Sequence, residues 1–201
     1  MEFRAVNNVC AVCLKDLSLP ITQTQALKIL TSKGFSIINV DIVTLARKCI
    51  GYSLYKRGAQ PSQAPRLVDC SSFIKWLYGQ AGLWLPRRTI QQIQLGGLVN
   101  YSHLMAGDVI FVSGYINYYL KKPLNGVGHV GLYTGQKNVI HAANSKNNVI
   151  ETPLDKFIKP GWRGARRYFS KNKKIITLKT PSNREVETAD DIKWIILQSL
   201  K

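Results

Sequence analysis

Residues 69–78 read Asp-Cys-Ser-Ser-Phe-Ile-Lys-Trp-Leu-Tyr and predict a helix that begins with a cysteine. The apolar residues of this stretch recur at helical spacing, which indicates one buried face. Asp69 suits a helix start and Gly82 suits a helix end. Cys70 would then lie in the first turn, where free N–H groups and the positive end of the helix dipole stabilise a thiolate and lower the thiol pKa. The position predicts a nucleophile, and a buried structural cysteine fits it equally well.

Two of the three histidines of the chain follow in a predicted β-hairpin. His129 opens one strand in Gly-His-Val-Gly, and His141 lies on the next strand, after a tight turn at residues 135–137. Because the turn is short, we expect the strands to pair and both imidazoles to face the same side. The glycines beside His129 would let another element approach closely.

These three residues match the roles that cysteine-dependent hydrolysis requires. A cysteine nucleophile needs a base within hydrogen-bond reach, and that base needs a group that orients it. Cys70, His129 and His141 can supply the three roles. A zinc ion held by the same Cys-His-His set is the other interpretation. The thiol at the helix start favours the nucleophile, so we expect no metal and no cofactor.

The order of predicted elements indicates an α+β fold, with N-terminal helices packed on a central antiparallel β-sheet. Helices are expected over residues 22–33, 41–55, 70–78 and 86–94, and a loop over 52–66. Strands are expected over residues 109–112, 130–134, 138–142, 149–150 and 165–169. The chain then continues with a strand near 175–178 and a helix over 189–200, capped by Thr188.

Composition narrows the partners of this 201-residue chain. Its 28 Lys and Arg residues against 11 Asp and Glu give a net charge of +17, which favours an anionic surface or polymer, although solubility alone would also account for it. The sequence has no zinc-finger spacing, aromatic RNA-binding signature or basic helical run, so we expect no specific nucleic acid. We expect a monomer without a transmembrane segment, because no apolar run approaches the length that spans a bilayer.

The remaining cysteines and histidine predict no second site. Cys10 and Cys13 form a single C-x-x-C without a second pair of ligands, so we interpret them as small apolar residues. Cys49 lies in an apparent helix and is expected to be buried. His103 is expected at the surface of a loop.

A string of motifs, taken in order, resembles the NlpC/P60 family of bacterial cell-wall cysteine peptidases. The motifs are Tyr-Lys-Arg-Gly at 55–58, Val-Asp-Cys-Ser-Ser-Phe at 68–73, Leu-Pro-Arg-Arg-Thr at 85–89 with Gln91, Gln92 and Gly96, Met-Ala-Gly-Asp-Val-Ile-Phe at 105–111, Gly-His-Val-Gly-Leu-Tyr-Thr-Gly at 128–135, Val-Ile-His-Ala at 139–142 and Gly-Ala-Arg-Arg-Tyr at 164–168. Each piece is short, but the combination is highly specific. The resemblance covers about residues 40 to 169.

The resemblance implies a papain-like fold and a thiol protease that cuts peptidoglycan stem peptides. The usual bond lies between D-glutamate and a diamino acid. Cys70 would be the nucleophile, His129 the base and His141 the orienting residue, with the backbone N–H of Cys70 in the oxyanion hole. The substrate-binding residues implied are Tyr55, Asp69, Ser71 and Ser72. Asp69 would contact the free amine of the stem peptide.

The resemblance also suggests how the chain is divided. Residues 40–169 would form the catalytic domain, residues 1–39 an N-terminal helical extension, and residues 170–201 a C-terminal strand and helix. The stretch 113–127 is longer than is usual for the family, and we expect it to form a lid or substrate rim, with an unrelated surface loop as the alternative. No wall-anchoring repeat is recognised.

Two alternatives to a wall endopeptidase stay open. No secretion signal is visible, so we expect a cytoplasmic protein or one exported by a non-classical or injection route. The missing signal keeps one alternative open, a papain-like amidase, deamidase or acyltransferase that acts on a host protein or lipid. A papain-like fold is compatible with it, because a fold does not fix its substrate. The second is a non-enzymatic wall-binding module, which the intact Cys-His-His set argues against.

Overall fold

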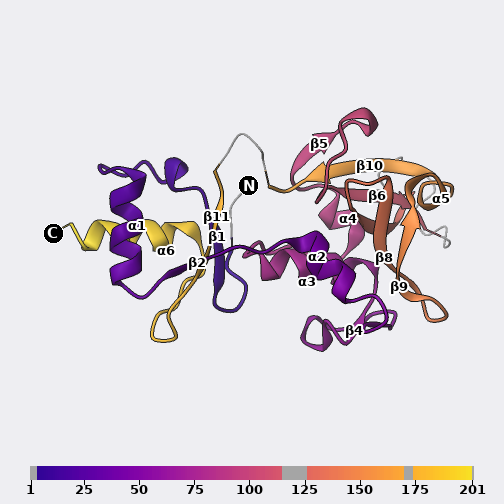
Figure 1. Ribbon diagram of the computed structural model, residues 1–201, viewed down its shortest axis with the longest axis horizontal. Coiled ribbons are helices and arrows are strands. Elements are labelled where there is room, and N and C mark those ends of the chain that lie inside the picture. Colours follow the sequence, from indigo (N-terminus) through magenta and orange to yellow (C-terminus); the bar gives the residue numbers. More distant parts are fainter. Residues whose placement is uncertain (1–3, 115–125, 170–173, 201) are drawn as a thin grey trace. The chain divides into compact units, whose positions relative to one another are not determined.

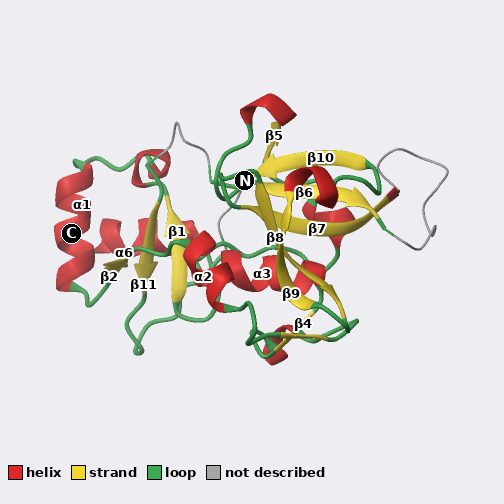
Figure 2. Cartoon of the chain, turned by 45° about the vertical axis from the view of Figure 1, so that its right-hand side comes forward, coloured by secondary structure: helices red, strands yellow, loops and turns green. Residues whose placement is uncertain are grey.

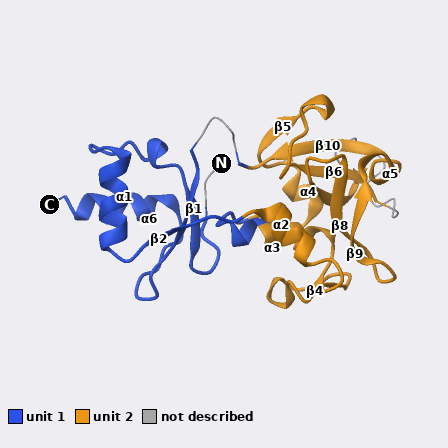
Figure 3. Cartoon of the chain, in the orientation of Figure 1, with its two compact units in different colours: residues 1–40, 78–84, 169–201 blue, residues 41–77, 85–168 orange. Residues whose placement is uncertain are grey.

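The computed structural model describes residues 4–114, 126–169 and 174–200. The chain forms two compact units (Figure 3). One consists of residues 41–77 and 85–168 and is called here the catalytic unit. The other consists of residues 1–40, 78–84 and 169–201 and is called the terminal unit.

A six-stranded antiparallel sheet, in the order β5-β10-β6-β7-β8-β9, is the centre of the catalytic unit (Figure 1). Its strands are β5 (Gly97–Val99), β6 (Val109–Ser113), β7 (Val127–Tyr133), β8 (Asn138–Asn144), β9 (Asn148–Pro153) and β10 (Trp162–Arg167). The α+β class with a central antiparallel sheet is therefore confirmed. Most residues of β6 and β7 are buried, as expected for strands of a sheet that is covered on both faces.

Short helices and a small parallel strand pair complete this unit. The helices are α2 (Ile42–Lys48), α3 (Cys70–Gln80), α4 (Thr89–Gln92) and α5 (Leu154–Phe157), with 3-10 turns η2 (Pro61–Gln63) and η3 (Tyr101–His103). Helix α3 begins in this unit, and its residues after 77 belong to the terminal unit. Strands β3 (Leu54–Tyr55) and β4 (Leu67–Val68) pair in parallel. Figures 1 and 2 show α2 and α3 side by side. Fully buried Phe73, Ile74 and Leu77 form the apolar face of α3 that its sequence spacing predicts.

The terminal unit is a three-stranded antiparallel sheet in the order β1-β11-β2, with two helices. Its elements are β1 (Val9–Val12), η1 (Leu14–Leu17), α1 (Gln23–Ser32), β2 (Ser36–Ile38), β11 (Ile176–Lys179) and α6 (Ala189–Gln198). Both helices begin with a capping box, Thr22 with Gln25 and Thr188 with Asp191. The two chain ends thus share one sheet, in which Val9 lies opposite Lys179.

Some element boundaries differ from the sequence prediction. The helix predicted over 41–55 begins after its cap Asp41 but ends at Lys48. The turn after it places Gly51 at a φ of 77°, a left-handed conformation that stops a helix. Strands β1, β2 and β5 have only three or four residues, too few for alternation to be read, and were not predicted. Among the described residues, no helix is long and apolar enough to cross a bilayer.

Candidate active site

Cys70 is the first residue of α3, and the residues around it fix the start of the helix. The Asp69 carboxylate accepts a hydrogen bond from the Ser72 backbone N–H at 2.9 Å, and the Asp69 backbone N–H donates to the Ser72 hydroxyl at 2.8 Å. This reciprocal cap holds the first turn in place. Cys70 is half-buried and can still meet a ligand.

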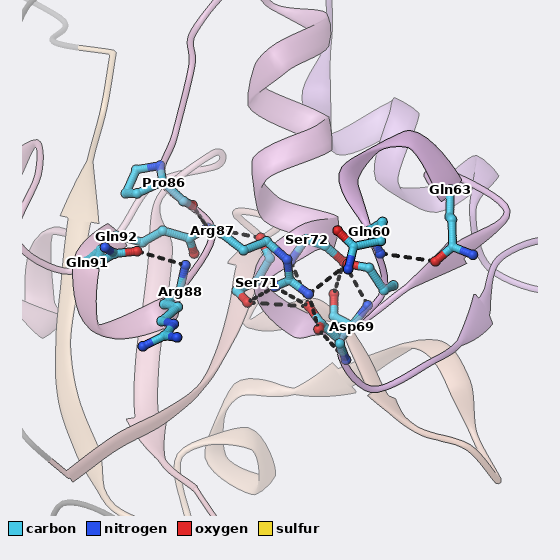
Figure 4. A network of polar contacts seen from close by, with 12 residues as sticks. Gln60, Gln63, Asp69, Ser71, Ser72, Pro86, Arg87, Arg88, Gln91 and Gln92 are labelled. Atoms are coloured by element: carbon cyan, nitrogen blue, oxygen red, sulfur yellow. Dashed lines mark hydrogen bonds and ion pairs between the residues drawn. The ribbon is translucent and has the colours of Figure 1, made fainter.

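Asp69 is engaged on both carboxylate oxygens (Figure 4). One oxygen accepts from Ser72, from the Ser71 hydroxyl at 3.3 Å and from Arg87 Nη1 at 3.0 Å, and the other accepts from the Gly58 N–H at 3.0 Å and from Arg87 Nη2. Burial raises the pKa of Asp69, but the hydrogen bonds and the charge of Arg87 outweigh it and hold that pKa below its ordinary value. Asp69 is therefore an ionised, neutralised carboxylate.

The predicted hairpin brings the two histidines into contact, and both face the same side as predicted. His129 on β7 and His141 on β8 place Nε2 and Nδ1 2.8 Å apart. The second nitrogen of His141, Nε2, lies 3.0 Å from the Thr152 hydroxyl on β9. Phe157 packs against both rings, with centroids 5.6 and 4.8 Å away. A chain of hydrogen bonds therefore runs from His129 through His141 to Thr152.

The glycines in this region serve the close approach that the sequence predicts. A Cβ on Gly128 would lie 2.3 Å from the Gly114 Cα. A Cβ on Gly131 would lie 2.4 Å from the Val139 side chain and 2.9 Å from the Phe157 ring. Glycine thus allows the strand that carries His129 to pack tightly against its neighbours.

Burial keeps both imidazoles neutral near pH 7. It lowers the pKa of His129 to about 4. The same cause, together with the charge that His129 would carry, lowers the pKa of His141 to about 3. The two nitrogens that face each other are also too close for a metal ion between them, because two metal–nitrogen bonds of about 2.0 Å would need a wider separation.

The pKa of Cys70 differs from the sequence expectation. The helix start predicts a lowered pKa, whereas burial, followed by the nearby Asp69 charge, raises the pKa of Cys70 to about 12. Hydrogen bonds from the backbone N–H groups of Ser71 and Val130 act in the opposite direction but do not outweigh burial. Cys70 therefore rests as a thiol, and the neutral imidazole of His129 lines the same cavity.

The candidate nucleophile and the candidate base lie at one cavity of about 620 Å³. Cys70 and His129 both line it, and Tyr55, Asp69 and Ser71 of the predicted substrate-binding residues line it too. Its other lining residues are Arg57, Gly58, Gln60, Arg87, Arg88, Thr89, Ile90, Gly114, Val127, Gly128 and Ala143. Among the described lining residues neither His141 nor Ser72 is present. His141 instead supports His129, and Ser72 caps α3.

Tyr55 stands close to the thiol. Burial raises its pKa, and the nearby groups Cys70 and Asp69 raise it further. The phenol is therefore protonated at neutral pH and can donate a hydrogen bond into the cavity.

The sequence missed two groups of site residues. Thr152 lies two residues beyond Ile150, which is the partner of His141 across the β8–β9 pair, so it shares the face of His141. That register was the signal that could have found it. Arg57 and Arg88 fell within the quoted motifs but were given no role.

The other sequence predictions concern residues away from the site. His103 is exposed in η3, and Cys10, Cys13 and Cys49 are buried. In the described part of the chain, no three His, Cys, Asp or Glu side chains are grouped to hold a metal ion. The lid predicted over 113–127 rests largely on residues 115–125, which lie outside the described residues.

Comparison with known proteins places this fold and cavity in one family. The model of the NlpC/P60 family matches residues 54–167, so the chain belongs to the NlpC/P60 family. A probable endopeptidase of Corynebacterium glutamicum is 40% identical over 114 residues, which are 57% of this chain and 47% of that protein. A gamma-D-glutamyl-L-lysine dipeptidyl-peptidase of Bacillus cereus is 34% identical over 104 residues, 50% of this chain and 28% of that protein.

A solved structure shows the same architecture. An NlpC/P60 family protein from Bacillus cereus superposes with a TM-score of 0.56 at 28% identity, over 67% of this chain and 42% of the other. The chain spans about half or less of the length of the curated relatives named above.

Proposed function

We propose that this chain is a cysteine endopeptidase that hydrolyses an amide bond in peptidoglycan stem peptides. The observation that carries the proposal is the shared cavity of Cys70 and His129, with His141 2.8 Å behind His129. Family membership supports it, since the relatives named above are described as an endopeptidase and a dipeptidyl-peptidase. The dipeptidyl-peptidase name favours the bond between D-glutamate and the diamino acid.

The hydrogen bonds of the histidine pair define which tautomer can act as base. His129 Nε2 faces His141, so Nδ1 is the nitrogen left to accept the Cys70 proton. For Nδ1 to be unprotonated, Nε2 must carry the hydrogen and donate it to His141 Nδ1. His141 then carries its hydrogen on Nε2 and donates it to the Thr152 hydroxyl. The opposite direction of the chain would protonate His129 Nδ1 and block the base.

The reaction proceeds as a general-base nucleophilic substitution. His129 Nδ1 takes the thiol proton as the sulfur attacks the scissile carbonyl carbon. The developing oxyanion is stabilised by the Cys70 backbone N–H at the start of α3. The imidazolium then gives the proton to the leaving amine, which leaves a thioester on Cys70. Water, deprotonated by His129, hydrolyses the thioester and restores the thiol.

Digestion of purified peptidoglycan and of soluble stem peptides, followed by mass spectrometry, tests the proposal. Products cut between D-glutamate and the diamino acid are expected with the native chain and are expected to vanish with Cys70→Ala. Cys49→Ala is the matched control, because Cys49 is a free, buried cysteine outside the cavity lining and its loss should leave cleavage intact. Cleavage that survives Cys70→Ala would refute the assignment, and cleavage of no stem peptide would refute the substrate.

A further inference from the structure

One segment of the catalytic unit combines positive charge with exposed apolar side chains. Residues 42–68, from α2 to the end of β4, contain five Lys and Arg residues and no Asp or Glu. In the same segment Ile50, Tyr52 and Leu54 are 40%, 51% and 41% exposed. Single exposed apolar residues are ordinary on a protein surface. Three of them within five residues, among basic side chains, are typical of a surface that binds a partner.

The backbone places two of these side chains on the outer side of the segment. The N–H groups of Leu54 and Lys56 donate to the carbonyls of Arg66 and Val68, at 2.9 and 2.8 Å, so this stretch is extended and pairs with β4. Side chains alternate along an extended chain, which puts Leu54 and Lys56 on one face and Tyr55 on the other. Tyr55 lines the cavity, whereas Leu54 and Lys56 are absent from its described lining. The face of Leu54 and Lys56 therefore points away from the cavity.

Tyr52 and Arg66 continue this outer face. The Arg66 guanidinium lies over the Tyr52 ring, 5.6 Å from its centroid, and both side chains are exposed. Figures 1 and 2 show β4, which Arg66 directly precedes, at an outer edge of the catalytic unit. We call Tyr52, Leu54, Lys56 and Arg66, together with Ile50 in the turn before them, the outer patch.

The acids of the catalytic unit leave the charge of the outer patch uncompensated. Residues 41–77 and 85–168 contain 17 Lys and Arg but only five acids. Asp155 lies in the first turn of α5. The other four have local partners: Asp41 caps α2, Asp69 pairs with Arg87, Asp108 pairs with Arg167, and Glu151 pairs with Arg47. Within the described part of the chain, neither Lys56 nor Arg66 forms an ion pair.

This combination of groups fits the interface of an anionic lipid bilayer. Basic side chains are attracted to anionic headgroups, and exposed apolar side chains gain free energy when they enter the boundary between headgroups and acyl chains. A tyrosine suits the headgroup level, because its ring is apolar and its hydroxyl is polar. A hydrophilic polyanion would satisfy the charges but would bury none of the apolar side chains. The outer patch therefore favours a lipid surface over an anionic polymer.

We propose that the outer patch binds the surface of an anionic lipid bilayer. Ile50, Tyr52 and Leu54 enter the interface, while Lys56 and Arg66 contact headgroup phosphates. This function goes beyond peptide hydrolysis and does not depend on it, since the side chains of the outer patch are absent from the described cavity lining.

Vesicle sedimentation with the full chain tests the proposal. Vesicles of phosphatidylglycerol and phosphatidylcholine in equal parts are compared with vesicles of phosphatidylcholine alone, at low salt. The native chain should partition onto the anionic vesicles at least about tenfold more strongly, because each basic residue near an anionic surface contributes about fivefold. For the same reason, Lys56→Gln with Arg66→Gln should weaken this binding about tenfold or more. Tyr52→Ser with Leu54→Ser should also weaken it about tenfold, through the lost apolar burial.

Two variants elsewhere in the catalytic unit are the matched controls. Lys156→Gln with Lys159→Gln removes the same charge from two exposed lysines in and after α5. Leu98→Ser removes an apolar side chain that is 73% exposed on β5. Both should stay within about threefold of native binding, because charges beyond a Debye length of the contact are screened. Controls that weaken binding as much as the patch variants would overturn the outer patch.

Soluble polyphosphate separates a lipid surface from an anionic polymer. Its binding should fall with the variant that lacks both charges and stay unchanged in Tyr52→Ser with Leu54→Ser. If this apolar variant binds anionic vesicles as the native chain does, charge alone acts and the bilayer proposal is overturned. Equal binding of the native chain to anionic and neutral vesicles would overturn it as well.

Circular dichroism shows whether each variant is folded. If the apolar double variant is unfolded, Ile50→Ser supplies the apolar test, since Ile50 lies in a turn outside the β3–β4 pair. It should weaken binding to anionic vesicles about fivefold. Native-like binding by a folded Ile50→Ser would then overturn the proposal.

Discussion

The hydroxyl of Thr152 offers the sharpest test of how the histidine pair is held. It lies 3.0 Å from Nε2 of His141, whose side chain is buried, so water cannot readily replace it. Thr152→Val keeps the shape of the side chain and removes the hydroxyl. Leaving a buried N–H without its acceptor costs about 1–3 kcal/mol. That energy disfavours the one tautomer of His141 that lets His129 Nδ1 accept a proton.

The expected result is a loss in kcat of about tenfold, since about 1.4 kcal/mol corresponds to a factor of ten. KM should stay the same, because Thr152 is absent from the described cavity lining. The hydroxyl also supports a positive charge on His129 through His141, so its removal should lower the pKa that governs the acid limb of the kcat profile. Thr152→Ser should restore both kcat and this limb.

Steady-state kinetics on a stem peptide from pH 4 to pH 8 would check the argument. Circular dichroism and the thermal unfolding midpoint would show whether each variant is folded. An unchanged kcat in Thr152→Val would refute the proposed direction of the hydrogen-bond chain. Equal impairment of the Val and Ser variants would show that the hydroxyl is not the group that matters.

Three further predictions follow from burial. The pKa of His129 in the folded chain, about 4, lies below its ordinary value of 6.5, so the unfolded chain binds the proton first and stability is lost as pH falls below 6.5. Denaturant unfolding should therefore show about 2 kcal/mol less stability from this group at pH 4.5 than at pH 7. His129→Gln should remove this part of the pH dependence, and an unaltered pH dependence would contradict the prediction. Alkylation of Cys70 by iodoacetamide should still rise steeply above pH 8, and a plateau below pH 7 would contradict the raised pKa. Gly131→Ala should destabilise the fold by about 1–3 kcal/mol, because its Cβ would overlap Val139 and Phe157, and a variant as stable as the native chain would disprove this overlap.

Much of the fold of the catalytic unit could be predicted because its signals are local. The start of α3 follows from a capping residue and an apolar face within one short stretch. The His129–His141 contact follows from a tight turn between two strands, since pairing then places both side chains on one face. The motifs of the family added the order in which these pieces occur.

The terminal unit could not be read in the same way. Strands β1 and β11 are separated by more than 150 residues, and no local pattern tells one to pair with the other. Strand β2 has three residues, of which two are exposed, so it has no apolar alternation to detect. The sequence therefore separates two terminal segments that the structure joins in one sheet.

The sequence by itself determined the chemical groups at the site: a cysteine at a helix start, two histidines on one hairpin, and an α+β order of elements. Only the tertiary structure decided what each of these groups contacts, how it is oriented and how its pKa is shifted. It gave His141 its partner Thr152, and it turned Arg87 toward Asp69 while Arg88 points away. It also raised the pKa of Cys70, against the effect of the helix start. The reason is that desolvation and charge pairing sum over neighbours from distant parts of the chain, whereas helix starts and hairpins depend on adjacent residues.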